Sequence, residues 1–151
     1  MLDMGEGLRR DARAAVACFA RAADVHGLAD AQNSLGCMLE SGEGVAKNKE
    51  DACRCYGLAA AQGLAPAMFN LAALYDNGEG VEKDEAAAVR LYMQAAELGH
   101  RGAQFTIGFY FERGMGLRRS RSNAVRWYRA AAAQGDALAQ QALRRLGVVW
   151  E

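Results

Sequence analysis

The sequence predicts an all-α protein, an α/α superhelical solenoid of helix-turn-helix repeats with a 36-residue period. Two observations support this fold class: glycine, alanine and tyrosine positions recur in phase along the chain, and apolar residues inside each repeat follow helical spacing. The composition is compatible with a packed core, because 52% of the 151 residues are hydrophobic and 24% are charged. A single proline, Pro66, leaves long helices free to form.

The repeat is most visible in its glycines. Gly42, Gly78 and Gly114 lie 36 residues apart, and each is followed two positions later by another glycine. The same step relates three tyrosines (56, 92 and 128), three alanines (52, 88 and 124) and four further glycines (27, 63, 99 and 135). We therefore expect a single repeat domain over residues 1–151, with a partial repeat at 1–27, repeats at about 28–63, 64–99 and 100–135, and a terminal helix at 136–151.

The first repeat is expected to be partial. Its opening residues, "MLDMGEGL", align with "MLESGEGV" of the next repeat, which places Met1 and Leu2 in the last turn of a helix whose front is missing. A turn at "GEG" and a helix from Asp11 to Asp24 should follow. This alignment predicts that the chain is a fragment of a longer repeat protein.

Each full repeat should contain two helices. In the first, Ala31, Leu35 and Met38 follow the i, i+4, i+7 spacing of one helix face. Pro66 falls in a first turn, where a missing N–H costs nothing. The second helix should follow a residue whose side-chain oxygen can accept hydrogen bonds from the first turn, and the equivalent positions hold Asp11, Asn48, Asp84 and Ser120. After the last helix, the apolar end "GVVWE" could fold back as a cap, continue into further sequence or contact another molecule.

The Gly-x-Gly segments raise the question of a phosphate site. A phosphate loop of the Walker type also needs a following Gly-Lys-Ser/Thr, and a dinucleotide fingerprint needs a preceding strand and a third glycine. Neither is present, and a helix is predicted before Gly42. Glycine directly after a helix is a common C-terminal stop, because it adopts positive φ without steric cost. We therefore interpret each glycine pair as a corner between helices.

Two stretches, "AQNSLGCMLESGEGVAKNKEDACRCYGLAAAQG" and "AMFNLAALYDNGEGVEKDEAAAVRLYMQAAELG", closely resemble Sel-1-like repeats, whose hallmark is the Gly-x-Gly-Val turn. The resemblance covers nearly the whole chain. It implies a solenoid related in shape to tetratricopeptide repeats, used as a scaffold or adaptor that binds other proteins or peptides. Secreted cysteine-rich relatives carry cysteines at two helix ends where this chain has Ala60 and Ala67, so the resemblance implies no disulfides here.

No residue pattern for catalysis is present, and we predict no catalytic residue, no cofactor and no metal site. Cys53 and Cys55 point about 200° apart around a helix, so they cannot chelate one ion. With Cys18, they occupy repeat positions that hold valine, leucine or tryptophan elsewhere, which indicates small buried apolar residues. His26 and His100 are expected to be exposed turn residues. Unpaired thiols favour the cytoplasm, but a missing N-terminal signal would reverse this, so the localisation stays unassigned.

The first helices of helix-pair solenoids line the concave side, and the positions of these helices that face it are candidates for a binding groove. The predicted partner-binding residues are Asn33, Phe69, Asn70, Phe105, Thr106 and Phe109. The alternative is that the phenylalanines pack between repeats. The sequence alone does not separate the two.

Charge is balanced overall, with 18 basic and 18 acidic residues, but it is uneven along the chain. From residue 101 onward there are nine basic and three acidic residues, a net charge of +6. Arg118, Arg119 and Arg121 form the centre of this basic patch. We interpret the patch first as a solvated face, and next as a dock for an acidic protein or for the acidic half of a second copy. Trp127 and Tyr128 fall in core positions, which argues against stacking on nucleic-acid bases.

The predicted function is therefore non-enzymatic binding of a protein or peptide by the concave surface. Self-association through exposed repeat ends is a further prediction. The alternatives are an enzyme built on the scaffold, either a hydrolase or a thiol enzyme, and nucleic-acid binding through the arginine-rich turn. No stretch approaches the roughly 18 consecutive apolar residues of a membrane span, so no membrane partner is predicted.

Overall fold

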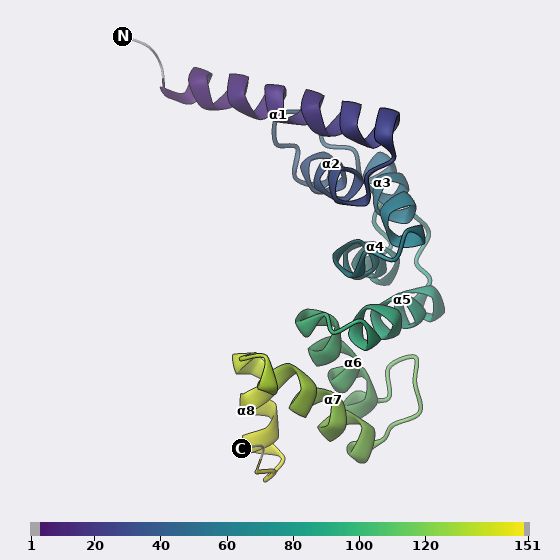
Figure 1. Ribbon diagram of the computed structural model, residues 1–151. Coiled ribbons are helices and arrows are strands. Elements are labelled where there is room, and N and C mark those ends of the chain that lie inside the picture. Colours follow the sequence, from purple (N-terminus) through teal and green to yellow (C-terminus); the bar gives the residue numbers. More distant parts are fainter. Residues whose placement is uncertain (1–3, 150–151) are drawn as a thin grey trace.

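The computed structural model describes residues 4–149 and folds them into eight helices (Figure 1). In chain order these are α1 (Met4–His26), α2 (Ala29–Ser41), α3 (Lys49–Ala61), α4 (Ala65–Asn77), α5 (Glu85–Glu97), α6 (Arg101–Arg113), α7 (Arg121–Ala133) and α8 (Ala137–Arg145). Residues 4–149 contain no strand. Each helix packs on the next one from α1 to α8, which confirms the predicted α/α solenoid.

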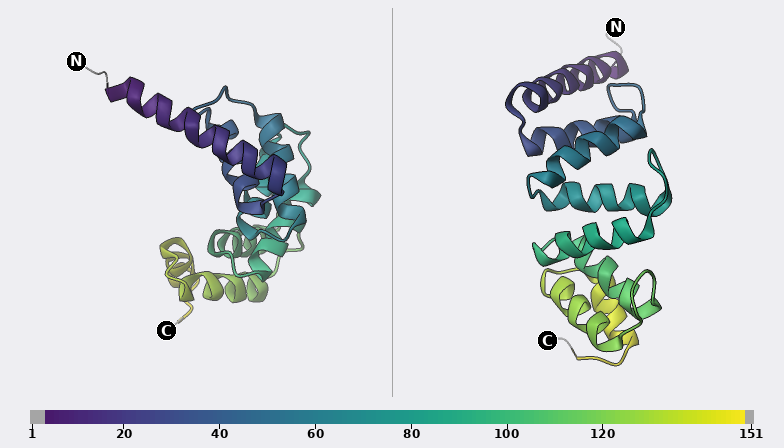
Figure 2. Two further views of the ribbon diagram at one scale, coloured as in Figure 1. Left: turned by 45° about the horizontal axis from the view of Figure 1, so that its top comes forward. Right: turned by 90° about the vertical axis from the view of Figure 1, so that its right-hand side faces the viewer.

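The helix pairs stack into a curved ladder. Figure 1 shows the first helices α2 and α4 on the inner side of the curve and the second helices α3 and α5 on the outer side. The right-hand view of Figure 2 shows the two edges of the ladder: the longer loops within pairs lie along one edge, and the short turns between pairs lie along the other. Side chains of α2 and α4 that point away from the second helices therefore line the concave side.

Local sequence explains where the second helices begin. The side chains of Asn48, Asp84 and Ser120 accept hydrogen bonds from backbone N–H groups three residues later, at the starts of α3, α5 and α7. These oxygens satisfy donors that have no partner inside the helix. Pro66 lies in the first turn of α4. All four assignments agree with the sequence prediction.

The first glycine of each pair ends a first helix. Gly42 has φ +79°, and its N–H and that of Glu43 both donate to the carbonyl oxygen of Met38, at 2.8 and 3.2 Å. Gly78 and Gly114 end α4 and α6 in the same left-handed conformation. The amides that would wrap a phosphate are used inside the turn, which confirms the interpretation of these segments as corners.

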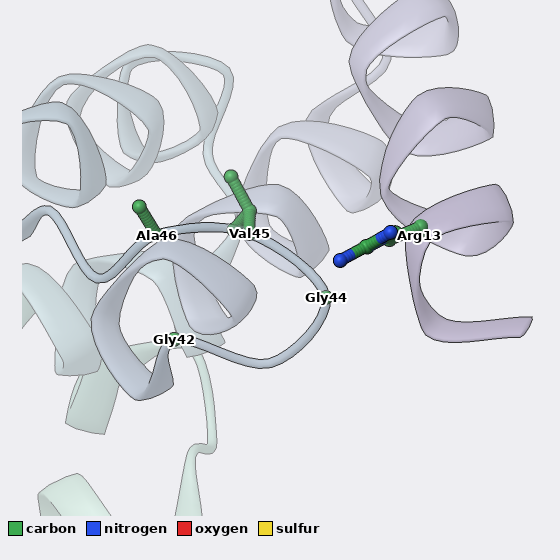
Figure 3. A pocket seen from close by; sticks show the side chains of 5 residues that line it. All are labelled: Arg13, Gly42, Gly44, Val45 and Ala46. Atoms are coloured by element: carbon green, nitrogen blue, oxygen red, sulfur yellow. The ribbon is translucent and has the colours of Figure 1, made fainter. Parts of the chain in front are cut away.

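The second glycine of each pair brings the loop against the preceding repeat. A Cβ atom on Gly80 would lie 2.4 Å from the carbonyl carbon and oxygen of Lys49, in the first turn of α3. A Cβ atom on Gly44 would lie 2.6 Å from the carbonyl carbon of Ala12 in α1. Figure 3 shows this loop beside α1, where Arg13 points toward Gly44. These contacts fix the spacing between consecutive repeats.

Within a pair, an aromatic residue of the second helix packs on a small residue of the first. A Cβ atom on Gly36 would lie 2.6 Å from Cε1 of Tyr56, and one on Gly108 would lie 2.8 Å from Cδ1 of Tyr128. Both tyrosines are buried, as are the alanines at positions 52, 88 and 124. Small residues at these positions allow the close approach of the two helices.

The buried side chains form two clusters along the stack. The larger cluster spans α3 to α6, and the smaller one spans α7 and α8. Phe109 and Phe111 of α6 are half-buried and pack against both clusters. The core is therefore continuous through α6, and its C-terminal part depends on that junction.

The predicted corner in the first repeat is wrong. α1 runs without interruption from Met4 to His26, so the "GEG" at residues 5–7 and Asp11 lie inside a helix. In the next repeat the corner is closed by carbonyls of a preceding helix: the carbonyl of Leu39, for example, accepts from the N–H of Asn48 at 2.8 Å. Gly5 and Gly7 are helical instead, so neither takes the left-handed conformation that ends α2 at Gly42. Met1 and Leu2, aligned above with an earlier helix, lie outside the described residues.

The C-terminal end is partly covered by its own chain. Val148 donates its N–H to the carbonyl of Leu143 at 2.9 Å and packs against the smaller cluster. Arg121 donates to the carbonyl of Leu146 at 2.7 Å. Folding back, one of the three possibilities for the terminal residues, is therefore observed for Val148. Val149 is exposed, and Trp150 lies outside the described residues.

α8 differs from the other first helices at the position that receives an aromatic residue. Arg144 stands one repeat after Gly108, where the ring of Tyr128 packs in the preceding pair. Where α2, α4 and α6 carry glycine or alanine at this position, α8 carries an exposed arginine.

Candidate protein-binding surface

The polar members of the predicted groove come from α2, α4 and α6. Asn33 and Asn70 meet across two repeats, since Nδ2 of Asn70 donates to Oδ1 of Asn33 at 3.2 Å. The same amide nitrogen lies 3.8 Å from Sγ of Cys37. Thr106 instead donates its hydroxyl to the carbonyl of Gly102 within α6, at 2.9 Å. The structure thus brings Asn33 and Asn70 together, while Thr106 bonds its own helix.

The phenylalanines are half-buried and contact second helices. The ring of Phe69 lies edge-on to Tyr92, with centroids 5.5 Å apart, and stacks on His100 at 4.7 Å. The ring of Phe105 lies 5.6 Å from that of Tyr128. Phe69 therefore contacts both its own repeat and the next one, whereas Phe105 contacts the second helix of its own repeat, and each residue keeps a solvent-exposed part. Phe69 and Phe105 are thus packed against second helices and partly accessible to solvent at the same time.

Phe109 links the aromatic positions to basic residues at the end of α6. Its ring lies 6.5 Å from that of Tyr110, and the guanidinium of Arg113 lies over it at 5.5 Å. A cation over an aromatic face is attracted by the electron-rich ring. The first-helix face therefore runs directly into the basic end of the molecule.

The three predicted patch arginines have different environments. Arg118 and Arg119 are exposed in the loop between α6 and α7. Arg121, the first residue of α7, donates to the backbone of Leu146 and so helps to hold the C-terminal end. Trp127 is half-buried against the larger cluster, and Tyr128 is 1% exposed, which confirms its predicted core position.

Glu112 is the acidic centre of the basic end. Arg145 contacts both of its carboxylate oxygens, at 2.7 and 2.9 Å, and the hydroxyl of Tyr128 donates to it at 2.6 Å. The hydrogen bond from Arg145 lowers the pKa of Glu112 below its ordinary value, against the opposing effect of burial. Glu112 and Arg145 are 33 residues apart, and no sequence pattern indicated their pairing.

The cysteines are less buried than predicted. Cys18 and Cys37 are exposed, which is wrong for Cys18, and Cys53 and Cys55 are half-buried. α1 packs on α2, whereas α3, α5 and α7 each pack on helices before and after them, so the same repeat position is more open in α1. Burial raises the pKa of Cys53 and Cys55. A reactive thiol requires the opposite shift.

His100 is not the exposed turn residue that the sequence suggested; His26 has no described side chain. His100 is half-buried, stacks on Phe69 and caps α6, because its Nδ1 accepts from the N–H of Ala103 at 3.1 Å. An accepting Nδ1 requires the neutral ring. Burial, followed by the nearby Arg101, lowers the pKa of His100 below its ordinary value.

This cap should make stability depend on pH. Because the folded pKa is lowered, the unfolded chain binds the proton more readily, so the free energy of unfolding should fall as pH drops below about 6.5, the ordinary histidine pKa. We expect His100→Asn to keep a capping oxygen and to lose this dependence. The urea unfolding midpoints of the wild-type protein and of His100→Asn, measured at about pH 7.5 and 5.5, test this expectation. Both proteins contain His26, so its contribution cancels when their acid shifts are compared. Equal acid shifts in the two proteins would contradict the role of His100.

One edge of the ladder carries a cavity that the sequence analysis missed. In the first and third full repeats two glutamines bridge the pair, Gln62 to Gln32 and Gln134 to Gln104, each at 2.8 Å. The middle repeat has Met68 and Leu98 at these positions, and Leu98 is 59% exposed. A cavity of about 560 Å³ opens there, lined by Ala60, Ala61, Gly63, Met68, Gln94, Glu97 and Leu98. The sequence does carry a signal for this cavity: residues 68 and 98 are not glutamine, unlike the equivalent residues of the other two full repeats.

The described residues contain no group of three or more histidine, cysteine, aspartate or glutamate side chains able to hold a metal ion. Within residues 4–149, no helix combines the length and the apolar character needed to cross a membrane. Both statements concern the described part of the chain.

Comparison with known proteins identifies the repeats. A family model described as "Sel1 repeat" matches residues 1–25, 29–64, 65–100 and 102–136. No curated protein matches the chain. Among solved structures, a Sel1 repeat protein from Oxalobacter formigenes is 40% identical with a TM-score of 0.74, over 77% of this chain and 46% of that one.

Two further structures share the fold. A protective antigen of uropathogenic Escherichia coli strains, which displays an SLR fold, is 33% identical with a TM-score of 0.83, over 90% of this chain and 30% of that one. Cysteine rich protein B of Helicobacter pylori is 20% identical with a TM-score of 0.72, over 90% and 97% of the two chains, and shows the fold alone. This chain spans less than half the length of the first two structures.

Proposed function

The chain belongs to the Sel1 repeat family, and from this premise we propose that it is a non-enzymatic scaffold that binds a protein or peptide along its concave, first-helix side. Sel1 repeat proteins are generally protein-interaction scaffolds. One observation carries the specific proposal: equivalent positions of α2, α4 and α6 present Asn33, Phe69 and Phe105 as half-exposed side chains, with Asn70 and Phe109 beside them.

The mixture of groups on this side fits protein recognition. Aromatic residues are enriched in protein interfaces, where large rigid rings bury area at small entropic cost. Phe69 and Phe105 are already held by contacts with Tyr92 and Tyr128, so they would lose little freedom on binding. The amide of Asn70 offers hydrogen-bonding capacity next to them.

Photo-crosslinking tests this assignment. We expect benzoylphenylalanine in place of Cys37 or Phe109, both on first helices, to capture a partner protein in cells that express the chain. The matched control carries the same group in place of Leu58, which is 52% exposed on the second helix α3. A partner captured equally from position 58, or from position 58 alone, would overturn the concave-side proposal.

We also propose that the exposed repeat end at α1 supports self-association. Phe19 occupies the position of α1 at which Tyr56 and Tyr128 pack on glycines of the preceding first helix, and here Phe19 and the neighbouring Ala15 are half-buried. Light scattering of the protein without a partner tests this, because it measures the molar mass as the concentration is raised. A constant monomer mass up to high concentration would reject it.

A further inference from the structure

A further cavity lies at the basic end of the molecule. Glu112 and Arg113 at the end of α6, Arg119 in the following loop and Arg145 in α8 line a cavity of about 390 Å³, which we call the arginine cavity. Three segments of the fold contribute to it. The stacking of α8 on the preceding pair is therefore what assembles it.

The charge inside the arginine cavity is only partly compensated. Arg145 is committed to Glu112 through a two-pronged ion pair. No carboxylate of the described residues lies within ion-pair distance of Arg113 or Arg119. With three cations and one anion among its lining residues, the cavity carries an excess of positive charge. A partner that supplies carboxylates would complete the pairing.

The surroundings extend the same field. Residues from 101 onward carry a net charge of +6, and the exposed Arg118 and Arg144 belong to the same end of the molecule. Arg113 lies over the ring of Phe109, a member of the first-helix surface proposed above. One extended segment could therefore contact the aromatic surface and the arginine cavity at once.

We propose that the arginine cavity binds the carboxylate side chains of an acidic peptide segment, whose neighbouring apolar residue rests on Phe109. This inference rests on the proposed function and names the chemistry of its partner. Guanidinium groups match carboxylates in planar, two-pronged hydrogen bonds. An acidic peptide fits better than single-stranded nucleic acid, which relies on exposed aromatic rings for base stacking; Tyr128 is 1% exposed and Trp127 packs on the core.

Fluorescence anisotropy with defined peptides tests the proposal. The probe is a fluorescein-labelled peptide of one phenylalanine followed by five glutamates, and the control peptide carries glutamines instead. We expect the glutamate peptide alone to bind, with affinity that weakens as salt is raised. The double variant R113Q/R119Q should lose affinity by about tenfold or more, because two charge-assisted contacts disappear. The control variant R54Q/R90Q removes two exposed arginines of α3 and α5 and should bind normally.

Each other outcome counts against the proposal. Equal binding of the two peptides, or unchanged affinity of R113Q/R119Q, overturns it. Stronger binding of a labelled oligothymidine would assign the cavity to nucleic acid, and a mass increase of the free protein that R113Q/R119Q abolishes would assign it to a second copy. Capture of the same partner by benzoylphenylalanine at position 37 in the R113Q/R119Q background would leave the proposed function intact while rejecting the acidic segment.

Discussion

Gly80→Ala is expected to lower the free energy of unfolding by about 2–5 kcal/mol, the combined cost of a strained backbone and of overpacking. Gly80 has φ +70°, which an L-residue with a Cβ adopts only at a cost. The added Cβ would also lie 2.4 Å from the carbonyl carbon and oxygen of Lys49 and 2.8 Å from the amide nitrogen of Glu50. These are backbone atoms, so the loop or the start of α3 must shift.

A matched variant separates the two costs. Gly63 has φ +87°, and a Cβ there would meet nothing within 4 Å. Gly63→Ala should therefore show the conformational cost alone, about 1–2 kcal/mol. Urea unfolding followed by circular dichroism measures both variants. Equal losses would show that the loop yields easily, and that the second glycine of each pair does not set the repeat spacing.

Tyr128→Ala is expected to destabilise the C-terminal part of the solenoid by about 3–5 kcal/mol, the usual cost of removing a buried aromatic side chain. Tyr128 is 1% exposed, packs on Gly108 and Phe105, and donates to Glu112. Its loss would open the smaller cluster and free Glu112 from one of its two partners. Repeat proteins transmit such damage mainly to neighbouring repeats.

Tyr128→Phe is the matched control, because it keeps the ring and removes only the hydroxyl. We expect a loss of about 1 kcal/mol, the net value of one hydrogen bond. Hydrogen exchange should show faster exchange in α7 and α8 of Tyr128→Ala, with α3 and α4 little changed. Uniformly faster exchange from α2 to α8 would mean that the solenoid unfolds as one unit, and would contradict the local effect expected for α7 and α8.

Both expectations concern residues that the sequence marks in the same way, by their recurrence. The glycines and the tyrosine recur every 36 residues, so their importance could be predicted, and so could their place in corners and in the core. The atoms that these residues contact could not be predicted. Lys49 lies 31 residues before Gly80, and no local pattern records how closely consecutive repeats approach.

The candidate site shows the same division. The groove residues and the patch arginines were predicted from helical position and charge, whereas the cap formed by His100 and the pair of Glu112 and Arg145 were not. His100 depends on a ring from α4, and Arg145 reaches back from α8 to α6. The corner predicted at residues 5–7 was wrong, because these residues continue the helix α1.

In the three full repeats the sequence by itself determined the helices, the caps of the second helices, the corners and the period, because each of these depends on bonds within a few residues or on exact repetition. The tertiary structure decided which arginines stay unpaired, which side chains share a cavity, and how far each phenylalanine is exposed. Those properties arise because the stacking of helix pairs brings together residues about 30 or more positions apart in the chain. A local sequence pattern does not show which of these residues will be in contact.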